Sequence, residues 1–154
     1  MDAKTRAELV AKYKAGYDAI TTALATVGDA ALDRVPKDGS WTPRVVVHHV
    51  ADSEMTSAIR LRRLLCEDNP TIVGYDEELF ARRLYYTDRP IESSLAAIRS
   101  ARETTAEILD RMADNDWLRV GTHTEMGAYS VGTWLEVYST HCHEHANQIL
   151  AATR

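Results

Sequence analysis

The sequence predicts an all-α fold, a four-helix bundle, on three observations. Four long stretches carry apolar residues at intervals of three or four, which is helical spacing, and strand-like alternation is almost absent. Four helices of this length favour a bundle, and the connection over residues 67–90 is long enough to cross over it. With 154 residues, we expect one domain, 1–154, that can bury a proper core.

The first two helices have recognisable ends. The first is expected over about residues 2–27, where Gly28 can stop it. Two residues mark the start of the second helix. Thr42 can cap it, and Pro43 fits the first helical position. It is expected to run to about Cys66. The apolar face of the first helix comprises Leu9, Tyr13, Tyr17, Ile20 and Leu24.

The second half of the chain predicts two more long helices and a short one. Residues 75–84 are expected to form a short helix within the long connection, followed by the third long helix over about 90–112. The stretch 114–129 is polar and contains two glycines, so it is a loop or a short hairpin. Ser130 can cap the last helix, expected over about 131–152.

Composition excludes several classes of partner and location. The formal net charge is −5 and no basic block occurs, so nucleic acid is not an expected partner. No apolar run approaches the roughly 20 residues of a membrane span, and the N-terminus lacks a signal-peptide core. Cys66 and Cys142 have no disulfide-framework spacing, so we expect a reduced cytoplasmic location and small buried side chains at both positions.

Three histidines fall within five residues near the end of the chain, and helix geometry separates them. Each residue turns about 100° on an α-helix, so His141 and His145 stack on one face while His143 points the other way. The pair continues a stripe that begins with Trp134 and Val137, so it is expected to face the bundle interior. Two stacked imidazoles in an interior are costly unless something uses them.

A third metal ligand is expected from the second helix. Of the adjacent His48 and His49, only one can face a given ion, and His49 lies on the core side because it falls between Val46 and Ser53 at helical spacing. Three neutral imidazoles on two helices would form a site with open positions, which is typical of catalytic rather than structural metals. Zinc, nickel, iron(II) and copper all suit such ligands.

Three other kinds of catalytic site match the sequence less well than a three-histidine metal site. Residues 141–145 match the H-x-x-E-H pattern of inverted zinc proteases, but only nine residues follow for the required third ligand. Glu144 is therefore expected to be solvated or to hydrogen-bond a ligand rather than to act as a base. A di-iron site fails because no histidine has a glutamate three residues before it, and no G-x-S-x-G elbow occurs.

A set of short motifs occurs in order along essentially the whole chain: Trp41-Thr42-Pro43, His48-His49-Val50-Ala51-Asp52-Ser53-Glu54, Cys66-Glu67-Asp68-Asn69-Pro70, Tyr75-Asp76 and His141-x-x-Glu144-His145-x-x-Gln148-Ile149. This ordered set resembles the DinB/YfiT-like superfamily, especially its YfiT-like branch. The resemblance implies an up-down-down-up four-helix bundle and a metal on His49, His141 and His145, and it leads us to expect a homodimer. We expect the metal to be a divalent transition metal, zinc or nickel.

The resemblance implies an enzyme that acts on a small molecule, either a thiol S-transferase using a low-molecular-weight thiol such as bacillithiol or mycothiol, or a hydrolase. A bound metal supports both, because it can activate a thiol or a water. The alternatives are a non-catalytic metal-binding module, such as a stress-response sensor or carrier, and a helical dimerisation domain whose histidines only hydrogen-bond in the core.

Several further residues are candidates for supporting roles around the three histidines. His123 lies in the polar stretch before the last helix, where it could carry protons at the pocket mouth or simply be an exposed loop residue. The candidates for hydrogen-bonding the metal ligands are Asp52, Ser53, Glu144 and Gln148.

Overall fold

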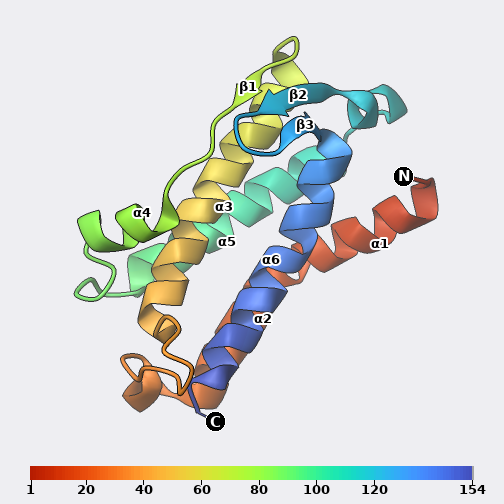
Figure 1. The fold of residues 1–154 in the computed structure, drawn as a ribbon. Coiled ribbons are helices and arrows are strands. Elements are labelled where there is room, and N and C mark those ends of the chain that lie inside the picture. The colour runs from red at the N-terminus through yellow and green to blue at the C-terminus, as the bar shows by residue number, and fades with distance from the viewer. Residues whose placement is uncertain (154) are drawn as a thin grey trace.

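The computed structural model describes residues 1–153 and confirms the four-helix bundle (Figure 1). In the view of Figure 1 the first and last arms of the bundle run downward and the two middle arms run upward, which is the up-down-down-up order. The helices of the four arms are α1 Ala3–Lys14 with α2 Gly16–Val27, then α3 Pro43–Cys66, α5 Glu92–Leu109 and α6 Val131–Ala151.

The two helices that carry the histidines begin where the sequence predicts. The Thr42 hydroxyl accepts a hydrogen bond from the backbone N–H of Val45 at 3.4 Å, and Pro43 opens α3. The Ser130 hydroxyl likewise accepts from the N–H of Thr133 at 3.0 Å at the start of α6. Each cap satisfies one of the backbone donors that a helix start leaves without an intrahelical partner.

The first arm is two helices rather than the single helix predicted over 2–27. The break falls at Ala15, and a buried side chain from α5 explains it. The guanidinium of Arg102 donates to the backbone carbonyl of Tyr13, through Nε at 3.1 Å and also through Nη2. Gly16 leaves room for this group, because a Cβ at that position would lie 2.5 Å from Nη2.

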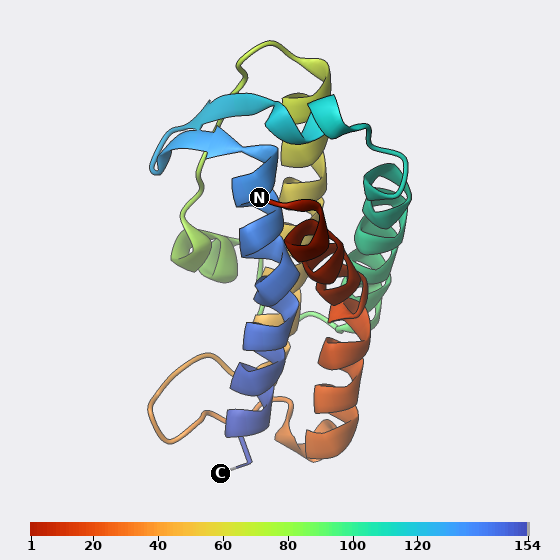
Figure 2. The ribbon, with the colours of Figure 1, turned by 90° about the vertical axis from the view of Figure 1, so that its right-hand side faces the viewer.

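A small three-stranded sheet lies across the end of the bundle at which α6 begins (Figure 2). The predicted hairpin is present, as β2 Val120–His123 and β3 Gly127–Ser130. The sequence does not predict β1, Thr71–Ile72, which pairs in parallel with β2. The other short elements are η1 Asp29–Ala31, α4 Glu77–Arg83 and η2 Asp114–Leu118.

The core face of α6 lies slightly to one side of the predicted stripe. Its fully buried line runs through Leu135, Tyr138, Cys142, Ala146 and Ile149. The predicted stripe member Val137 is instead 37% exposed, so the histidine pair lies at the edge of the core face.

Two further expectations about the chain can be compared with the structure. Burial of Cys142 is confirmed, but Cys66 is exposed at the end of α3, so the expectation of burial is wrong there. None of the described helices combines the length and the apolar character needed to span a membrane.

Candidate metal centre

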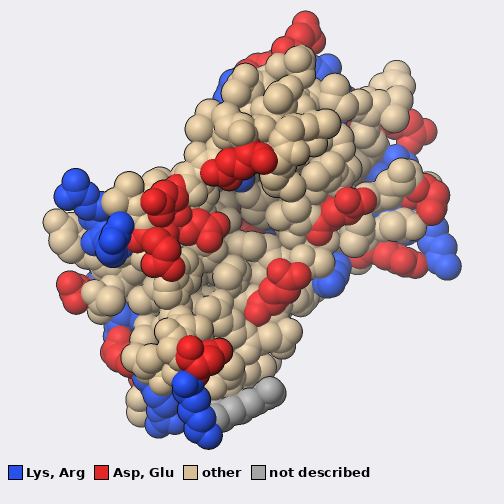
Figure 3. All heavy atoms as spheres, in the orientation of Figure 1, with Lys and Arg blue, Asp and Glu red and all other residues tan. Residues whose placement is uncertain are grey.

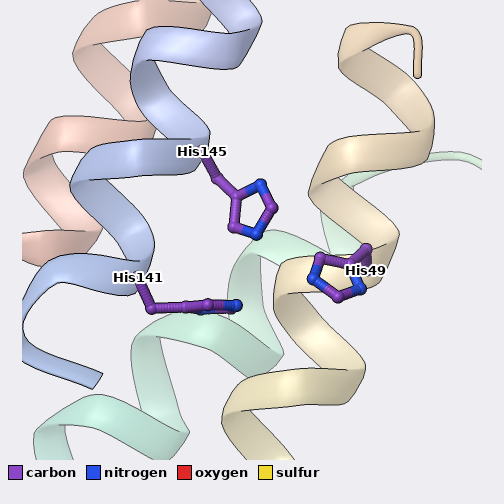
Figure 4. Close-up of side chains that lie close together, drawn as sticks. All are labelled: His49, His141 and His145. Atoms are coloured by element: carbon purple, nitrogen blue, oxygen red, sulfur yellow. The ribbon is translucent and has the colours of Figure 1, made fainter. Parts of the chain in front are cut away.

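Three histidines converge between α3 and α6 (Figure 4). His49 comes from the first half of α3, whereas His141 and His145 project from successive turns of α6. One ring nitrogen from each residue lies within 4.8 Å of the other two. Three such nitrogens are the type and number of protein ligands found at catalytic metal sites, where each nitrogen lies about 2.0–2.1 Å from the ion.

The three imidazole rings lie close to one another. Centroids lie 4.6 Å apart for His141 and His145, 4.7 Å for His49 and His145, and 5.5 Å for His49 and His141. His49 is buried, and the two α6 histidines are half-buried. The site therefore sits at the edge of the core, where one side of a bound ion can remain open.

Burial keeps two of these imidazoles neutral. Burial, with the neighbouring His145 and His141, lowers the pKa of His49 to about 3. Burial and His141 likewise lower the pKa of His145 to about 4. Neutral imidazoles have the free lone pair that a metal ligand requires, so the donors present fit a divalent transition metal.

Hydrogen bonding orients the rings of the α6 pair. The side-chain oxygen of Gln148 lies 2.8 Å from Nδ1 of His145. An amide oxygen only accepts, so Nδ1 carries the proton and Nε2 keeps its lone pair. Nδ1 of His141 is buried, and its close acceptor is a carboxylate oxygen of Glu54 at 3.5 Å.

The other candidates near the centre lie in different places. The Ser53 hydroxyl is 3.4 Å from Nε2 of His141, beside the point where the rings converge. Asp52 accepts a hydrogen bond from the hydroxyl of Tyr86 and so orients a tyrosine rather than an imidazole. Glu144 is exposed on the outside of α6, in keeping with a solvated residue.

His123 has a structural task in the hairpin. It is 5% exposed, so the exposed-loop alternative is wrong. Its Nδ1 accepts from the backbone N–H groups of Glu125 at 3.2 Å and Met126 at 3.4 Å, which fixes the turn between β2 and β3. Only Nε2 remains for the proton transfer predicted at the pocket mouth.

The two remaining histidines point away from the centre. His143 faces the first arm, where its Nε2 lies 3.0 Å from the carbonyl of Lys12. His48 is fully buried on the α5 side, although the sequence placed it less close to the core than His49. Its Nε2 bonds to the Arg89 carbonyl at 3.1 Å, and its Nδ1 to the Ser94 hydroxyl at 2.7 Å. Because adjacent residues on a helix point in different directions, His48 contacts the α5 side while His49 contacts the histidines of α6.

Sequence reasoning missed a buried ion pair beside the centre. Glu54 and Arg102 have side chains that are 0% and 3% exposed, and their closest atoms are 2.5 Å apart. A pattern does signal it, because Glu54 lies midway between the buried Val47 and Leu61 on one face of α3. Arg102 similarly interrupts the face of α5 that carries Ile98.

Comparison with known proteins identifies the family. The family model described as the DinB superfamily matches residues 12–149. The chain belongs to the DinB superfamily. The matched span contains all three converging histidines, all of α2, α3 and α5, and α6 up to its last two residues.

The chain is also similar to individual proteins whose names refer to a metal. The chain is 37% identical over 118 residues to a protein of Oceanobacillus iheyensis named "Putative metal-dependent hydrolase", covering 77% of this chain and 68% of that one. It is 31% identical over 157 residues to a protein of the same name from Geobacillus thermodenitrificans, covering 97% and 86%.

A solved structure, YfiT from Bacillus subtilis, superposes with a TM-score of 0.91 at 26% identity, covering 100% of this chain and 89% of that one. It is described as a probable metal-dependent hydrolase with an unusual four-helix bundle topology. The names of these relatives thus suggest that the family depends on a metal. This chain has a cluster of residues that could hold one.

Proposed function

We propose that this protein is a metal-dependent hydrolase that acts on a small molecule and holds its ion on His49, His141 and His145. The observation that supports this most strongly is the convergence of three imidazoles from α3 and α6 within 4.8 Å. Neutral ligands leave the full charge of a divalent ion in place. If His49, His141 and His145 held such an ion, zinc or nickel by ligand type, it would supply an activated water, since a catalytic metal can lower the pKa of a bound water from 15.7 to about 7.

Side chains next to the convergence point can orient a substrate. The Ser53 hydroxyl is close to His141, and the buried hydroxyl of Tyr75 has no hydrogen-bond partner among the described residues. Burial raises the pKa of Tyr75 to about 12, and the nearby Ser53 hydroxyl partly offsets the rise. Tyr75 thus stays protonated at neutral pH and is available as a hydrogen-bond donor to a substrate oxygen.

Charge around the centre favours a cation. Figure 3 shows acidic side chains gathered on the face formed by α4 and α6, with most Lys and Arg at its edges. Two acids interact with the histidines: Glu144 counteracts the fall in the pKa of His145, and His141 counteracts the rise in the pKa of Glu77. A surface of this sign raises the local concentration of divalent cations.

The same open position would accept a thiol, which defines the alternative reaction. A bound metal deprotonates a coordinating thiol, so a low-molecular-weight thiol would become the nucleophile of an S-transferase. Hydrolysis and S-transfer would depend equally on the three histidines. The two reactions differ in that only S-transfer needs an added thiol.

The test is a turnover assay on zinc- and nickel-loaded protein with two reagent classes, activated esters alone and thiol–electrophile pairs. We expect ester hydrolysis without thiol, abolished by His145→Ala and retained by the control His143→Gln, which changes a histidine of the same segment that points away. Turnover only with thiol would favour the transferase. Metal binding without any turnover would favour a binding module, and activity retained by His145→Ala would contradict the proposal.

A further inference from the structure

Beyond the three histidines, the structure points to a fourth essential side chain. We infer that Glu54 is a positioning residue for His141: its carboxylate accepts a hydrogen bond from the Nδ1–H of that ring and so leaves the Nε2 lone pair for an ion shared with His49 and His145. This inference rests on the proposed function, since it concerns the same centre. It goes further by making the buried ion pair part of the metal site.

The geometry around His141 leaves few alternatives for its Nδ1. This nitrogen is buried and has no hydrogen bond among the described residues, and an oxygen of Glu54 lies 3.5 Å away. A small rotation of the imidazole would close that distance to a hydrogen bond. The oxygen near Nδ1, Oε1, also accepts from Arg102 and from the Cys142 thiol, whereas Oε2 is buried and has no hydrogen-bond partner among the described residues. The carboxylate as a whole therefore has acceptor capacity left for His141.

Arg102 explains why a charged acceptor can exist here. Its Nη1 donates to Glu54 at 2.5 Å and to the thiol of Cys142 at 3.1 Å. The rest of the guanidinium is held by the carbonyls of Tyr13 and Tyr138. A buried charged group is costly unless it is paired and hydrogen-bonded, and the fixed guanidinium of Arg102 provides that pairing for Glu54.

Glu54, His141 and Cys142 could themselves be read as a second metal site, since their donor atoms lie within 4.8 Å of one another. The structure argues against this reading. The carboxylate oxygen nearest His141 already accepts from the Arg102 guanidinium, and this buried cation would repel a metal ion bound beside it. The group therefore supplies an acceptor to His141 rather than a set of ligands.

The pairing of a carboxylate with a ligand histidine has a known consequence. It fixes the tautomer and orientation of the ring and makes it a better donor, and losing such a partner typically costs 10–100-fold in metal affinity. Gln148 does the same for His145 with a neutral oxygen. The α6 pair would thus be held from both sides, by one charged and one neutral acceptor.

The direct test is nitrogen NMR of the histidine rings in metal-free wild-type protein, which reports which ring nitrogen of His141 carries the proton. We expect the Nδ1–H tautomer. A proton on Nε2 would overturn the inference. Because this measurement needs no metal, it separates the role of Glu54 from the proposed function: a wild type that binds no zinc would sink the function and leave the tautomer result standing.

Two variants then measure the effect on metal affinity by competitive zinc titration. Glu54→Gln keeps an acceptor oxygen without the charge, so we expect weaker binding by roughly 10-fold. The double variant Glu54→Met/Arg102→Met removes both charges and leaves no unpaired buried charge, a change that proteins often tolerate. We expect it to fold, to lose the preference for the Nδ1–H tautomer, and to bind zinc about 100-fold more weakly.

A matched control changes the exposed ion pair of Arg99 and Glu103 on the same helix, where the closest atoms are 2.8 Å apart. Arg99→Met/Glu103→Met should leave both the tautomer and the zinc affinity as in wild type. A purely structural ion pair would move folding stability but not the tautomer. Wild-type zinc affinity in the folded Glu54→Met/Arg102→Met variant would therefore contradict the inference.

Discussion

At the scale of single residues, the hydrogen bond from His145 to Gln148 is the simplest part of the site to perturb. The two atoms are 2.8 Å apart, and the amide oxygen fixes the ring so that Nε2 faces the other histidines. Gln148→Ala should weaken zinc binding by roughly 10-fold, because the ring loses its fixed tautomer and orientation. Competitive titration against Asn147→Ala, an exposed neighbour, measures it. Equal affinities in the two variants would show that the contact has no influence.

A second residue-scale prediction concerns pH. Burial, with Arg60 nearby, lowers the pKa of His123 below its ordinary value of 6.5, so the unfolded chain takes up a proton more readily than the folded one. The stability that the neutral ring contributes is therefore complete above 6.5 and is lost as the pH falls below that value.

Replacing His123 should reduce this pH dependence. His123→Asn keeps a side-chain acceptor for the turn but has no proton to gain. Denaturant unfolding of both metal-free proteins above and below pH 6.5 should show a smaller loss for the variant in acid. The other five histidines are the same in both proteins, so any effect they have cancels in the difference. A larger acid loss in the variant would contradict the prediction.

The sequence predicts which histidines converge, but it does not predict the Glu54–Arg102 ion pair beside them. The spacing of His141 and His145 places them together because four residues make about one helical turn, which is a local rule. Glu54 and Arg102 are 48 residues apart and come from different helices, so only folding brings them together. A charged residue interrupting an apolar face is the signal each leaves in the sequence.

At the scale of secondary-structure elements, the break in the first arm depends on Gly16. A Cβ there would lie 2.5 Å from Nη2 of Arg102 and 2.6 Å from its Cζ. The guanidinium cannot move freely, because it is buried and bonded to Glu54 and Tyr13. Gly16→Ala should therefore reduce the free energy of unfolding by roughly 1–3 kcal/mol, despite the better helix propensity of alanine.

Another helical glycine provides the control. At Gly132, in the first turn of α6, a Cβ would approach the Ser130 hydroxyl no closer than 3.4 Å. Gly132→Ala should leave stability unchanged or increase it by up to about 1 kcal/mol, since it removes freedom from the unfolded chain. Chemical denaturation of both variants gives the comparison. Equal effects at the two positions would mean that Arg102 does not require the missing side chain.

Elements whose ends are set by local chemistry could be predicted from the sequence, and those set by distant contacts could not. The start of α3 at Pro43 and of α6 after Ser130 follow from capping residues beside them. Strand β1 has two residues and exists because it pairs with β2, about fifty positions later. The division between α1 and α2 likewise depends on a side chain from α5.

At the scale of the whole molecule, a metal on this site would join two arms of the bundle that are far apart in the chain. His49 belongs to α3, and its partners belong to α6 at the other end of the sequence. A ligand that binds only the folded state at 100 times its dissociation constant stabilises it by about 2.7 kcal/mol. For a protein of this size that corresponds to a rise in melting temperature on the order of 5–10 °C.

Thermal unfolding with and without zinc, and after chelation, measures this linkage. The wild-type melting temperature should rise with zinc and fall back with chelator, whereas His49→Ala should respond to neither. His143→Gln should behave as wild type, because that ring contacts the backbone of Lys12 instead. A zinc-induced rise that persists in His49→Ala would place the stabilising ion elsewhere.

The central claim is that His49, His141 and His145 together hold one ion, and elemental analysis of purified protein tests it most directly. Wild type and His143→Gln should contain about one transition-metal ion per chain, after incubation with zinc or nickel salts if necessary. Alanine at any of the three positions should remove most of it. A wild type without metal after such incubation, or triple-alanine protein with metal still bound, would contradict the account.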